Sequence, residues 1–267
     1  MKAPVRLGAV SYLNVRPLVH GLDAHPGRVS LRFDVPAECA RLLAADEIDL
    51  GMVPSITYAG RPGDRIVPGV CIGSDGPVAS VALFSRKPLE DITQIALDTS
   101  SRTSAALVRI LCARRFGISP TFVSRPPDLP SMLSSCDAAL VIGDAALFAD
   151  HRALAAEKID LGAEWTAMTG LPFVWAFWSG RPAALDAGVV ALLGEAARDG
   201  RGHLDQIAND YCAAMPHRAA TARHYLRENL VFALGDRELQ GLRTYYREAA
   251  RLDLVTAPPS VVFFDRS

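Results

Sequence analysis

The densest group of side chains able to bind an anion lies between Thr99 and Ser104, in the stretch TSSRTS. Its five hydroxyl groups and one arginine follow a short apolar strand, Ile95–Leu97, and precede a helical pattern that ends at Gly117. Free backbone N–H groups and the helix dipole favour an anion at the amino end of a helix. One hydroxyl is enough to cap a helix, and a turn that only caps is the alternative interpretation. The stretch lacks the pattern of a nucleotide-binding loop, so it predicts a cradle for a small organic acid.

Two further polar side chains follow another predicted strand. The apolar run Val5–Val10 is typical of a buried strand, and Ser11 and Asn14 come just after it. In α/β folds, ligands bind outside the carboxyl ends of the strands. Ser11 and Asn14 therefore either contact a ligand at that edge or cap the segment that follows.

Two separated stretches share one design. In Ile48–Ser55 and in Cys136–Leu147, an aspartate begins a short apolar strand whose end turns into a helix. This similarity indicates two α/β lobes with matching strand ends. It adds Ser55 from the first stretch, and Gly143 and Asp144 from the second, to the candidates. Asp144 is either a helix cap or a carboxylate that faces the cleft.

One candidate lies within a strand instead of after it. Ser80 interrupts the apolar run Val78–Phe84. A buried serine in a strand is more often a hydrogen-bonded core residue than a ligand contact, and both interpretations stay open.

The composition is that of an ordinary globular protein. The chain has 267 residues, of which 50% are hydrophobic and 21% charged, enough for two modest cores. A net charge of −1 gives no general attraction to nucleic acid or to an anionic membrane. No apolar run is long enough to span a bilayer, and polar residues and proline interrupt the amino-terminal stretch where a signal peptide would be apolar. We therefore expect a cytoplasmic protein with a small-molecule partner.

The cysteines and histidines indicate neither disulfides nor a metal site. Five widely spaced cysteines, an odd number, are typical of reduced thiols buried in a core. The six histidines show no spacing typical of metal ligands, and none lies at a predicted strand end. We expect no cofactor, and the oligomeric state is left open.

Strands that alternate with helices predict an α/β fold, followed by a helical tail. We expect this tail to pack back on the first lobe and to contribute little chemistry. Lobe one would comprise residues 1–86 and 179–267, and lobe two residues 87–178. The chain would cross between them at Ser85–Pro88 and at Trp175–Arg181, making a hinge beside an interlobe cleft.

Five segments carry a resemblance to a known family, and they read RLGAVSYLNVRPLVHGL, IDLGMVPSITYA, ALDTSSRTSAALVRILC, ALVIGDAAL and DLGAEWTAMTGLPFVWAFW. Together they resemble chorismate dehydratase, the first enzyme of the futalosine route to menaquinone. The similarity runs from Val5 to about Trp178. It implies the two-lobed, type II periplasmic-binding-protein-like fold with an interlobe cleft. It also implies a protein that works inside the cell.

The resemblance implies a hydro-lyase that converts chorismate to 3-[(1-carboxyvinyl)oxy]benzoate and water. Loss of the ring C3 proton and the C4 hydroxyl makes the ring aromatic, and preorganised donors at the substrate's carboxylates stabilise the charge that develops. Because no histidine lies at a strand end, the base is either Asp144 or the substrate's own side-chain carboxylate. We favour the substrate's carboxylate.

The resemblance also implies a role for each candidate residue. Asn14 and Asp144 are the catalytic candidates, with Asn14 orienting the substrate or its leaving hydroxyl. Arg102 either binds a carboxylate or points outward as a surface charge. The substrate-binding candidates are Ser11, Ser55, Ser80, Thr99, Ser100, Ser101, Arg102, Thr103 and Gly143.

Three other functions are compatible with part of this sequence pattern. A non-catalytic solute-binding protein for a small organic acid has the same fold but normally needs export. The sibling lyase of the pathway, which opens cyclic dehypoxanthine futalosine, has a different amino-terminal motif. A DNA-binding regulator needs an additional helix-turn-helix, for which the sequence offers no spare amino-terminal segment.

Overall fold

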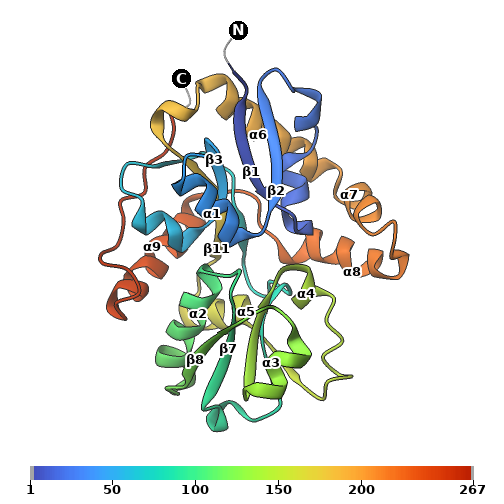
Figure 1. Cartoon of the computed structure of the whole chain (residues 1–267), viewed down its shortest axis with the longest axis vertical. Coiled ribbons are helices and arrows are strands. Elements are labelled where there is room, and N and C mark those ends of the chain that lie inside the picture. Colours follow the sequence, from blue (N-terminus) through green and yellow to red (C-terminus); the bar gives the residue numbers. More distant parts are fainter. Residues whose placement is uncertain (1–2, 266–267) are drawn as a thin grey trace.

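The chain folds into two lobes, each built around one β-sheet (Figure 1), in a computed structural model that describes residues 3–265. The first sheet consists of β1 (Val5–Val10), β2 (Val29–Asp34), β3 (Leu50–Pro54), β4 (Arg65–Ile66), β5 (Ile72–Ser74) and β11 (Phe173–Gly180). The second consists of β6 (Val81–Ser85), β7 (Gln94–Asp98), β8 (Thr121–Arg125), β9 (Ala138–Ile142) and β10 (Glu157–Asp160).

The order of the strands brings several carboxyl ends to the same edge of each sheet. The first sheet has the order β2-β1-β3-β11-β4, with β5 paired to β11, and the second has the order β10-β6-β9-β7-β8. β1 runs parallel to β2 and β3, and β7 runs parallel to β8 and β9. Helices connect these parallel strands, so the predicted α/β class is confirmed.

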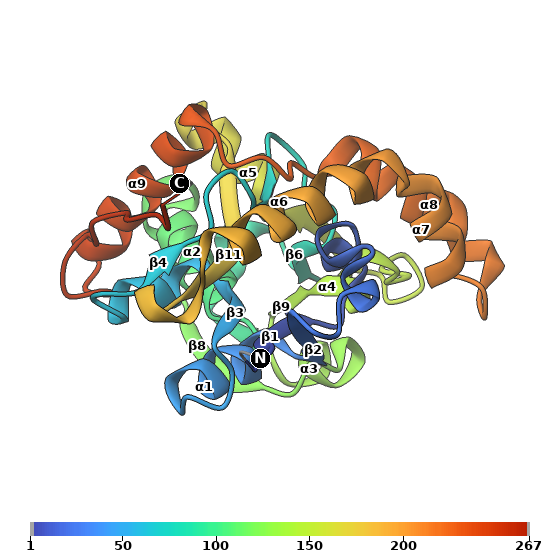
Figure 2. The same ribbon diagram turned by 90° about the horizontal axis from the view of Figure 1, so that it is seen from above.

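The helices cover both sheets and extend along the sides of the molecule. A 3₁₀ segment, η1 (Leu13–Val19), follows β1 directly. In Figure 1, α7 and α8 lie on one side and α9 on the other, and the view from above in Figure 2 separates them in the same way. The α-helices are α1 (Pro36–Ala44), α2 (Thr103–Leu111), α3 (Leu129–Ser135), α4 (Gly143–Leu147), α5 (Leu161–Thr169), α6 (Ala187–Gly202), α7 (Leu204–Tyr211), α8 (Ala219–His224) and α9 (Asp236–Arg251).

The crossings between the sheets differ from the expected ones. β6 already belongs to the second sheet, although residues 81–85 were assigned to lobe one. β11 belongs to the first sheet, although most of it was assigned to lobe two. Sheet membership therefore places the crossings at residues 75–80 and 161–172, and we propose these two segments as the lobe boundaries.

One carboxylate joins the two crossing segments. Asp160 accepts hydrogen bonds from the N–H groups of Val78 and Ala79 at 3.0 and 2.6 Å in the first segment. In the second segment it caps α5 by accepting from Gly162 and Ala163 at 2.9 and 3.0 Å. Both crossings thus meet at one residue, which is the arrangement expected at a hinge.

The aspartates immediately before β3 and β9, Asp49 and Asp137, play equivalent parts in the two lobes. Asp49 accepts the backbone N–H of Arg6 at 2.9 Å and pairs with its guanidinium. Asp137 accepts the backbone N–H groups of Thr93 and Gln94 at 2.9 and 3.0 Å and pairs with Lys87. Each aspartate thereby joins its strand to the start of the neighbouring parallel strand. The expected similarity of the two stretches is confirmed at this level.

Replacing Asp137 by asparagine is expected to lower the free energy of unfolding by about 1.5–3 kcal/mol, because charge-assisted hydrogen bonds are lost. Lys87, and then Thr93, hold the pKa of Asp137 well below its usual range. A carboxyl with a depressed pKa stabilises the fold above its unfolded pKa and loses this contribution as the pH falls. Urea unfolding of both proteins should therefore show a gap at pH 7 that shrinks below about pH 4. Asp91→Asn at an exposed position is the control, and a gap that widens with acid would contradict the assignment.

Candidate active site

A cavity lies between the lobes, at the edge where the carboxyl ends of β1, β3, β7 and β9 meet. Residues from both lobes therefore form its wall, as the strand-end argument predicts. The lining residues are Val10, Tyr12, Asn14, Val15, Pro36, Met52, Pro54, Ile72, Val78, Ser80, Val81, Ser101, Arg102, Thr103, Ser104, Ile142, Gly143, Trp175 and Ala176. Of the predicted candidates, the cavity brings together Asn14, Ser80, Ser101, Arg102, Thr103 and Gly143.

Asn14 and Ser80 share a partner that the sequence did not indicate. The Ser80 hydroxyl lies 2.7 Å from the hydroxyl of Tyr225, which also interacts with the side chain of Asn14. Burial raises the pKa of Tyr225, so its hydroxyl stays protonated. The Asn14 Oδ1 atom is buried and has no hydrogen-bond partner among the described residues. A buried acceptor without a partner in the wall of a cavity is free for a ligand.

The hydroxyl turn lies on the opposite side of the cavity and does not cap its helix through a side chain. α2 begins at Thr103, with Arg102 at the N-cap position and no side-chain hydrogen bond to the first turn. Ser101 and Thr103 are buried, and Arg102 is exposed while still lining the cavity. An uncapped helix start with buried hydroxyls and one guanidinium is a suitable site for a carboxylate.

Ser55 supports this turn from the other lobe without lining the cavity. Its hydroxyl donates to the Val174 carbonyl at 2.8 Å and lies 3.4 Å from the Thr103 hydroxyl. Thr103 Oγ1 also accepts the backbone N–H of Ile56 at 3.3 Å. Ser55 was predicted to bind substrate directly, whereas the structure gives it contacts to Thr103 across the lobes.

Thr99 and Ser100 lie outside the cavity wall. Thr99 is exposed. The backbone N–H and the hydroxyl of Ser100 both donate to Asp98 Oδ1, at 2.8 and 2.6 Å. Burial raises the pKa of Asp98, and the Ser100 side chain also interacts with the Tyr12 hydroxyl from lobe one. Ser100 thus connects Asp98 to Tyr12, and this connection crosses between the lobes.

Tyr12 packs against Gly143 from the opposite lobe. Gly143 has φ +63°, and a Cβ atom added there would lie 2.7 Å from the Tyr12 ring. This position therefore needs glycine for two reasons, the left-handed backbone and the close approach of the ring. Gly143 and Tyr12 together close one side of the cavity.

Asp144 lies beside the cavity and is not among its lining residues. Its Oδ1 accepts the backbone N–H of Leu13 at 3.2 Å, and its Oδ2 accepts the Tyr211 hydroxyl. Burial raises the pKa of Asp144, an effect that the Tyr211 hydrogen bond opposes. The Tyr211 hydroxyl also lies 3.2 Å from the carbonyl oxygen of Ser11, whose side chain does not line the cavity.

Helix α9 contacts both lobes next to the cavity. Two adjacent tyrosines donate to the two strand-end turns, Tyr245 to the Thr103 carbonyl at 2.9 Å and Tyr246 to the Ser55 carbonyl at 2.8 Å. Tyr245 also packs edge-on against Phe173, with ring centroids 4.8 Å apart. The carboxyl-terminal helices therefore support the two turns beside the cavity, although none of their residues is among those that line it.

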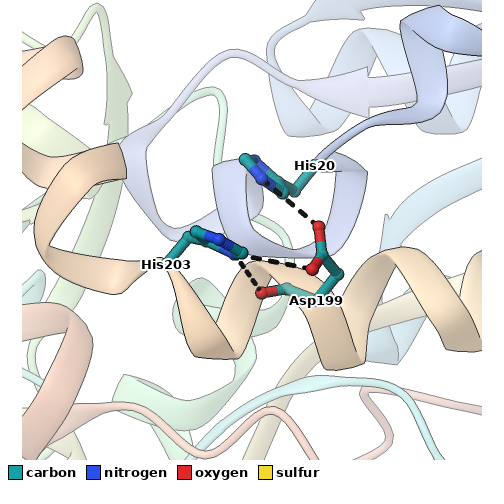
Figure 3. A group of neighbouring side chains, drawn as sticks. All are labelled: His20, Asp199 and His203. Atoms are coloured by element: carbon teal, nitrogen blue, oxygen red, sulfur yellow. Dashed lines mark hydrogen bonds and ion pairs between the residues drawn. The ribbon is translucent and has the colours of Figure 1, made fainter.

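Among residues 3–265, the cavity wall contains one charged side chain, Arg102, and no histidine, cysteine, aspartate, glutamate or lysine. The part of the chain that the structure describes does contain one group of three possible metal ligands, His20, Asp199 and His203 (Figure 3). A ring nitrogen of His20 and one of His203 lie 3.4 and 3.5 Å from the two carboxylate oxygens of Asp199, and none of the three residues lines the cavity. The cavity therefore offers hydroxyls, an amide and a guanidinium, a set that binds an organic acid.

A family model described as menaquinone biosynthesis matches residues 5–251. The chain belongs to this family. A protein from Thermus thermophilus named chorismate dehydratase is 33% identical over 96% of this chain and 97% of its own length. One of the same name from Campylobacter jejuni is 28% identical over 64% of this chain and 66% of its own length. The resemblance inferred from the five segments is thus confirmed.

Solved structures show the fold. A protein from Archaeoglobus fulgidus aligns with a TM-score of 0.76 at 14% identity, covering 95% of this chain and 99% of its own. The periplasmic aliphatic sulphonate binding protein SsuA from Escherichia coli aligns with a TM-score of 0.62 at 15% identity, covering 100% of this chain and 96% of its own. The predicted two-lobed, periplasmic-binding-protein-like fold is therefore confirmed. No helix within residues 3–265 is long and apolar enough to cross a membrane.

Proposed function

We propose that this family member is a chorismate dehydratase, which converts chorismate to 3-[(1-carboxyvinyl)oxy]benzoate and water. The observation that carries this proposal is an interlobe cavity with an anion cradle on one side and Asn14 on the other, without a titratable base in its described wall. The match to a protein of this name over nearly the whole chain supports it further.

The cradle at Ser101–Ser104 would bind a carboxylate of chorismate. The substrate carries two carboxylates, and the ring C3 proton is vinylogous to the ring carboxylate. As that proton leaves, charge spreads onto the carboxylate oxygens. The donors on this side of the cavity, namely the hydroxyls, Arg102 and the uncapped start of α2, would stabilise this charge in the transition state.

The opposite side of the cavity would orient the leaving hydroxyl. The Asn14 side chain interacts with Tyr225, which also contacts Ser80. This fixed network leaves Asn14 Oδ1 without a partner in the described chain. Asn14 would hold the C4 hydroxyl in the geometry for elimination, so that the C3–H and C4–O bonds break and water and an aromatic ring form.

The substrate's enolpyruvyl carboxylate is our proposed base. It is attached through oxygen at C3, next to the proton that leaves, and the described cavity wall contains no carboxylate or imidazole to compete with it. Asp144 is the alternative base, but both of its oxygens accept hydrogen bonds from Leu13 and Tyr211. The proton would pass to the substrate's carboxylate and leave with the hydroxyl as water.

Incubating the purified protein with chorismate tests the proposal. We expect the ultraviolet spectrum to change to that of a substituted benzoate, with a product of the expected mass. Binding without turnover would instead favour a solute-binding protein for an organic acid. No binding of chorismate would overturn the proposed dehydratase.

Chelation is expected to leave kcat/KM unchanged within about twofold. The physical reason is that the donors which stabilise the developing charge are protein hydroxyls and a guanidinium, and that the His20, Asp199 and His203 group does not line the cavity. Rates with and without EDTA, after metal-free dialysis, check this. Loss of activity restored by one particular divalent ion would contradict it.

The five cysteines support a reducing compartment. All of them are unpaired and buried, and burial raises the pKa of Cys39 to about 12, which keeps this thiol unreactive. We therefore propose that the enzyme acts in the cytoplasm, where thiols stay reduced.

A further inference from the structure

We propose that Asp144 and Tyr211 are positioning residues that fasten the lobes together and hold the turn carrying Asn14 in its reactive place. This proposal rests on the proposed function for its kinetic part and on geometry for its structural part. We call the group formed by Asp144, Tyr211 and the backbone of Ser11 and Leu13 the interlobe latch.

The latch crosses from the second lobe to the first. Asp144 stands in the first turn of α4, directly after β9 of the second sheet. Its two oxygens accept from Leu13, at the start of η1, and from Tyr211, the last residue of α7. η1 packs against β1 of the first sheet, and α7 packs against η1. An open cleft would separate Asp144 from them, so these bonds exist only when the lobes are together.

The latch acts on the segment that carries Asn14. η1 has Tyr12 at its N-cap position and no side-chain cap of its own. Asp144 accepts the Leu13 N–H and so supplies, from the other lobe, the acceptor that a cap residue normally provides. Tyr211 contacts the Ser11 carbonyl at 3.2 Å on the same turn. The backbone is thus held at Ser11 and Leu13, immediately before Asn14.

Arg16 contacts the Tyr211 ring through a cation–π interaction. Its guanidinium lies 4.4 Å from the centre of the Phe33 ring and 5.4 Å from that of Tyr211. Arg16 also lies on η1 and stabilises the negative charge of Asp144, as does Arg218. The Tyr211 hydroxyl is therefore directed at the carboxylate by packing as well as by its hydrogen bond.

A positioning role and a role as base predict different kinetics. A displacement of about 1 Å at a reacting group costs roughly a hundredfold in rate. Tyr211→Phe removes one hydroxyl and is expected to lower kcat/KM about tenfold, mainly through kcat. Asp144→Asn keeps an oxygen for the Leu13 N–H and should also lose about tenfold, whereas Asp144→Ala should lose about a hundredfold. A base at Asp144 would instead give a collapse of about ten-thousandfold in Asp144→Asn with binding intact.

The experiment combines kinetics with small-angle X-ray scattering on the full chain. The double variant Asp144→Asn/Tyr211→Phe should be no slower than the slower single variant, because both remove the same contact. Tyr58→Phe is the matched control, since its hydroxyl bonds the Asp64 and Ser260 carbonyls inside lobe one, and it should keep the wild-type rate. Without ligand, the Tyr211→Phe protein should have a larger radius of gyration than the wild type and the Tyr58→Phe control.

The scattering measurement tests the interlobe latch independently of whether the protein dehydrates chorismate. If the wild type fails to dehydrate chorismate while Tyr211→Phe still expands, the function is wrong and the latch stands. An unchanged rate together with an unchanged radius of gyration in Tyr211→Phe would overturn the latch. The ten-thousandfold collapse in Asp144→Asn, with chorismate still bound, would overturn it in favour of Asp144 as the base.

Discussion

Asn14→Asp is expected to lower kcat/KM for chorismate by more than a hundredfold. Leaving a buried polar group without its hydrogen-bond partner costs about 1–3 kcal/mol, or roughly ten- to a hundredfold in rate. The aspartate adds repulsion, because it places a carboxylate in a cavity meant for a substrate with two negative charges. Asn14→Ala, which loses the amide without adding a charge, should fall within the ten- to hundredfold range.

The comparison is made by steady-state kinetics and by binding of the benzoate product. Asn209→Asp makes the same chemical change at an exposed position where the side chain accepts from Arg223, and it should keep the wild-type rate. Thermal unfolding of all three variants shows whether the fold is intact. A folded Asn14→Asp protein within tenfold of the wild-type kcat/KM would show that Asn14 neither orients the substrate nor meets its charge.

Gly143→Ala is expected to lower kcat/KM by about a hundredfold or more. The φ of +63° costs a non-glycine residue about 1–2 kcal/mol. In addition, the new Cβ would lie 2.7 Å from the Tyr12 ring, a distance at which one of the two must move. Because Tyr12 and Gly143 come from opposite lobes, the movement displaces one wall of the cavity from the other, and the reacting groups with it.

A second glycine, Gly117, distinguishes the effect of backbone strain from the effect of the contact with Tyr12. Gly117 has φ +68° and no atom within 4 Å of a built Cβ, so Gly117→Ala carries similar backbone strain without a collision. Gly117→Ala should therefore be destabilised but catalytically normal, as measured by thermal unfolding and kcat/KM. Equal kinetic effects in the two alanine variants would mean that the contact between Tyr12 and Gly143 is not what closes the site.

The strand ends were predictable because short apolar runs have few structural options. Val5–Val10 has the bounds that the sequence predicts, as β1. Ligands bind at the carboxyl ends of parallel strands, and the family resemblance implies an interlobe cleft, so Asn14, the Thr99–Ser104 turn and Gly143 were expected to face one cleft. Asn14, residues Ser101–Ser104 of that turn and Gly143 do line one cavity.

The parts that escaped prediction depend on contacts between distant segments. An apolar run such as Phe173–Trp178 indicates a buried strand but not which sheet it joins, because pairing is decided by partners far along the chain. The contacts of Tyr211, Tyr225 and Tyr245 were equally unpredictable. These tyrosines lie on helices, where the sequence pattern predicts only that they belong to the core. Their only distinctive signal is a hydroxyl that needs a partner when buried.

The tyrosine pair of α9 has a consequence for the order in which the chain is made. The last strand of either sheet, β11, ends at Gly180, so the ribosome has completed every strand before it reaches Asp236. Tyr245 and Tyr246 then bond Thr103 and Ser55, one residue on each side of the cleft. A chain released before Asp236 would possess both sheets and Asn14, yet lack the element that spans the two strand-end turns. We therefore expect the site to be completed last during synthesis, after the strands of both sheets have been made.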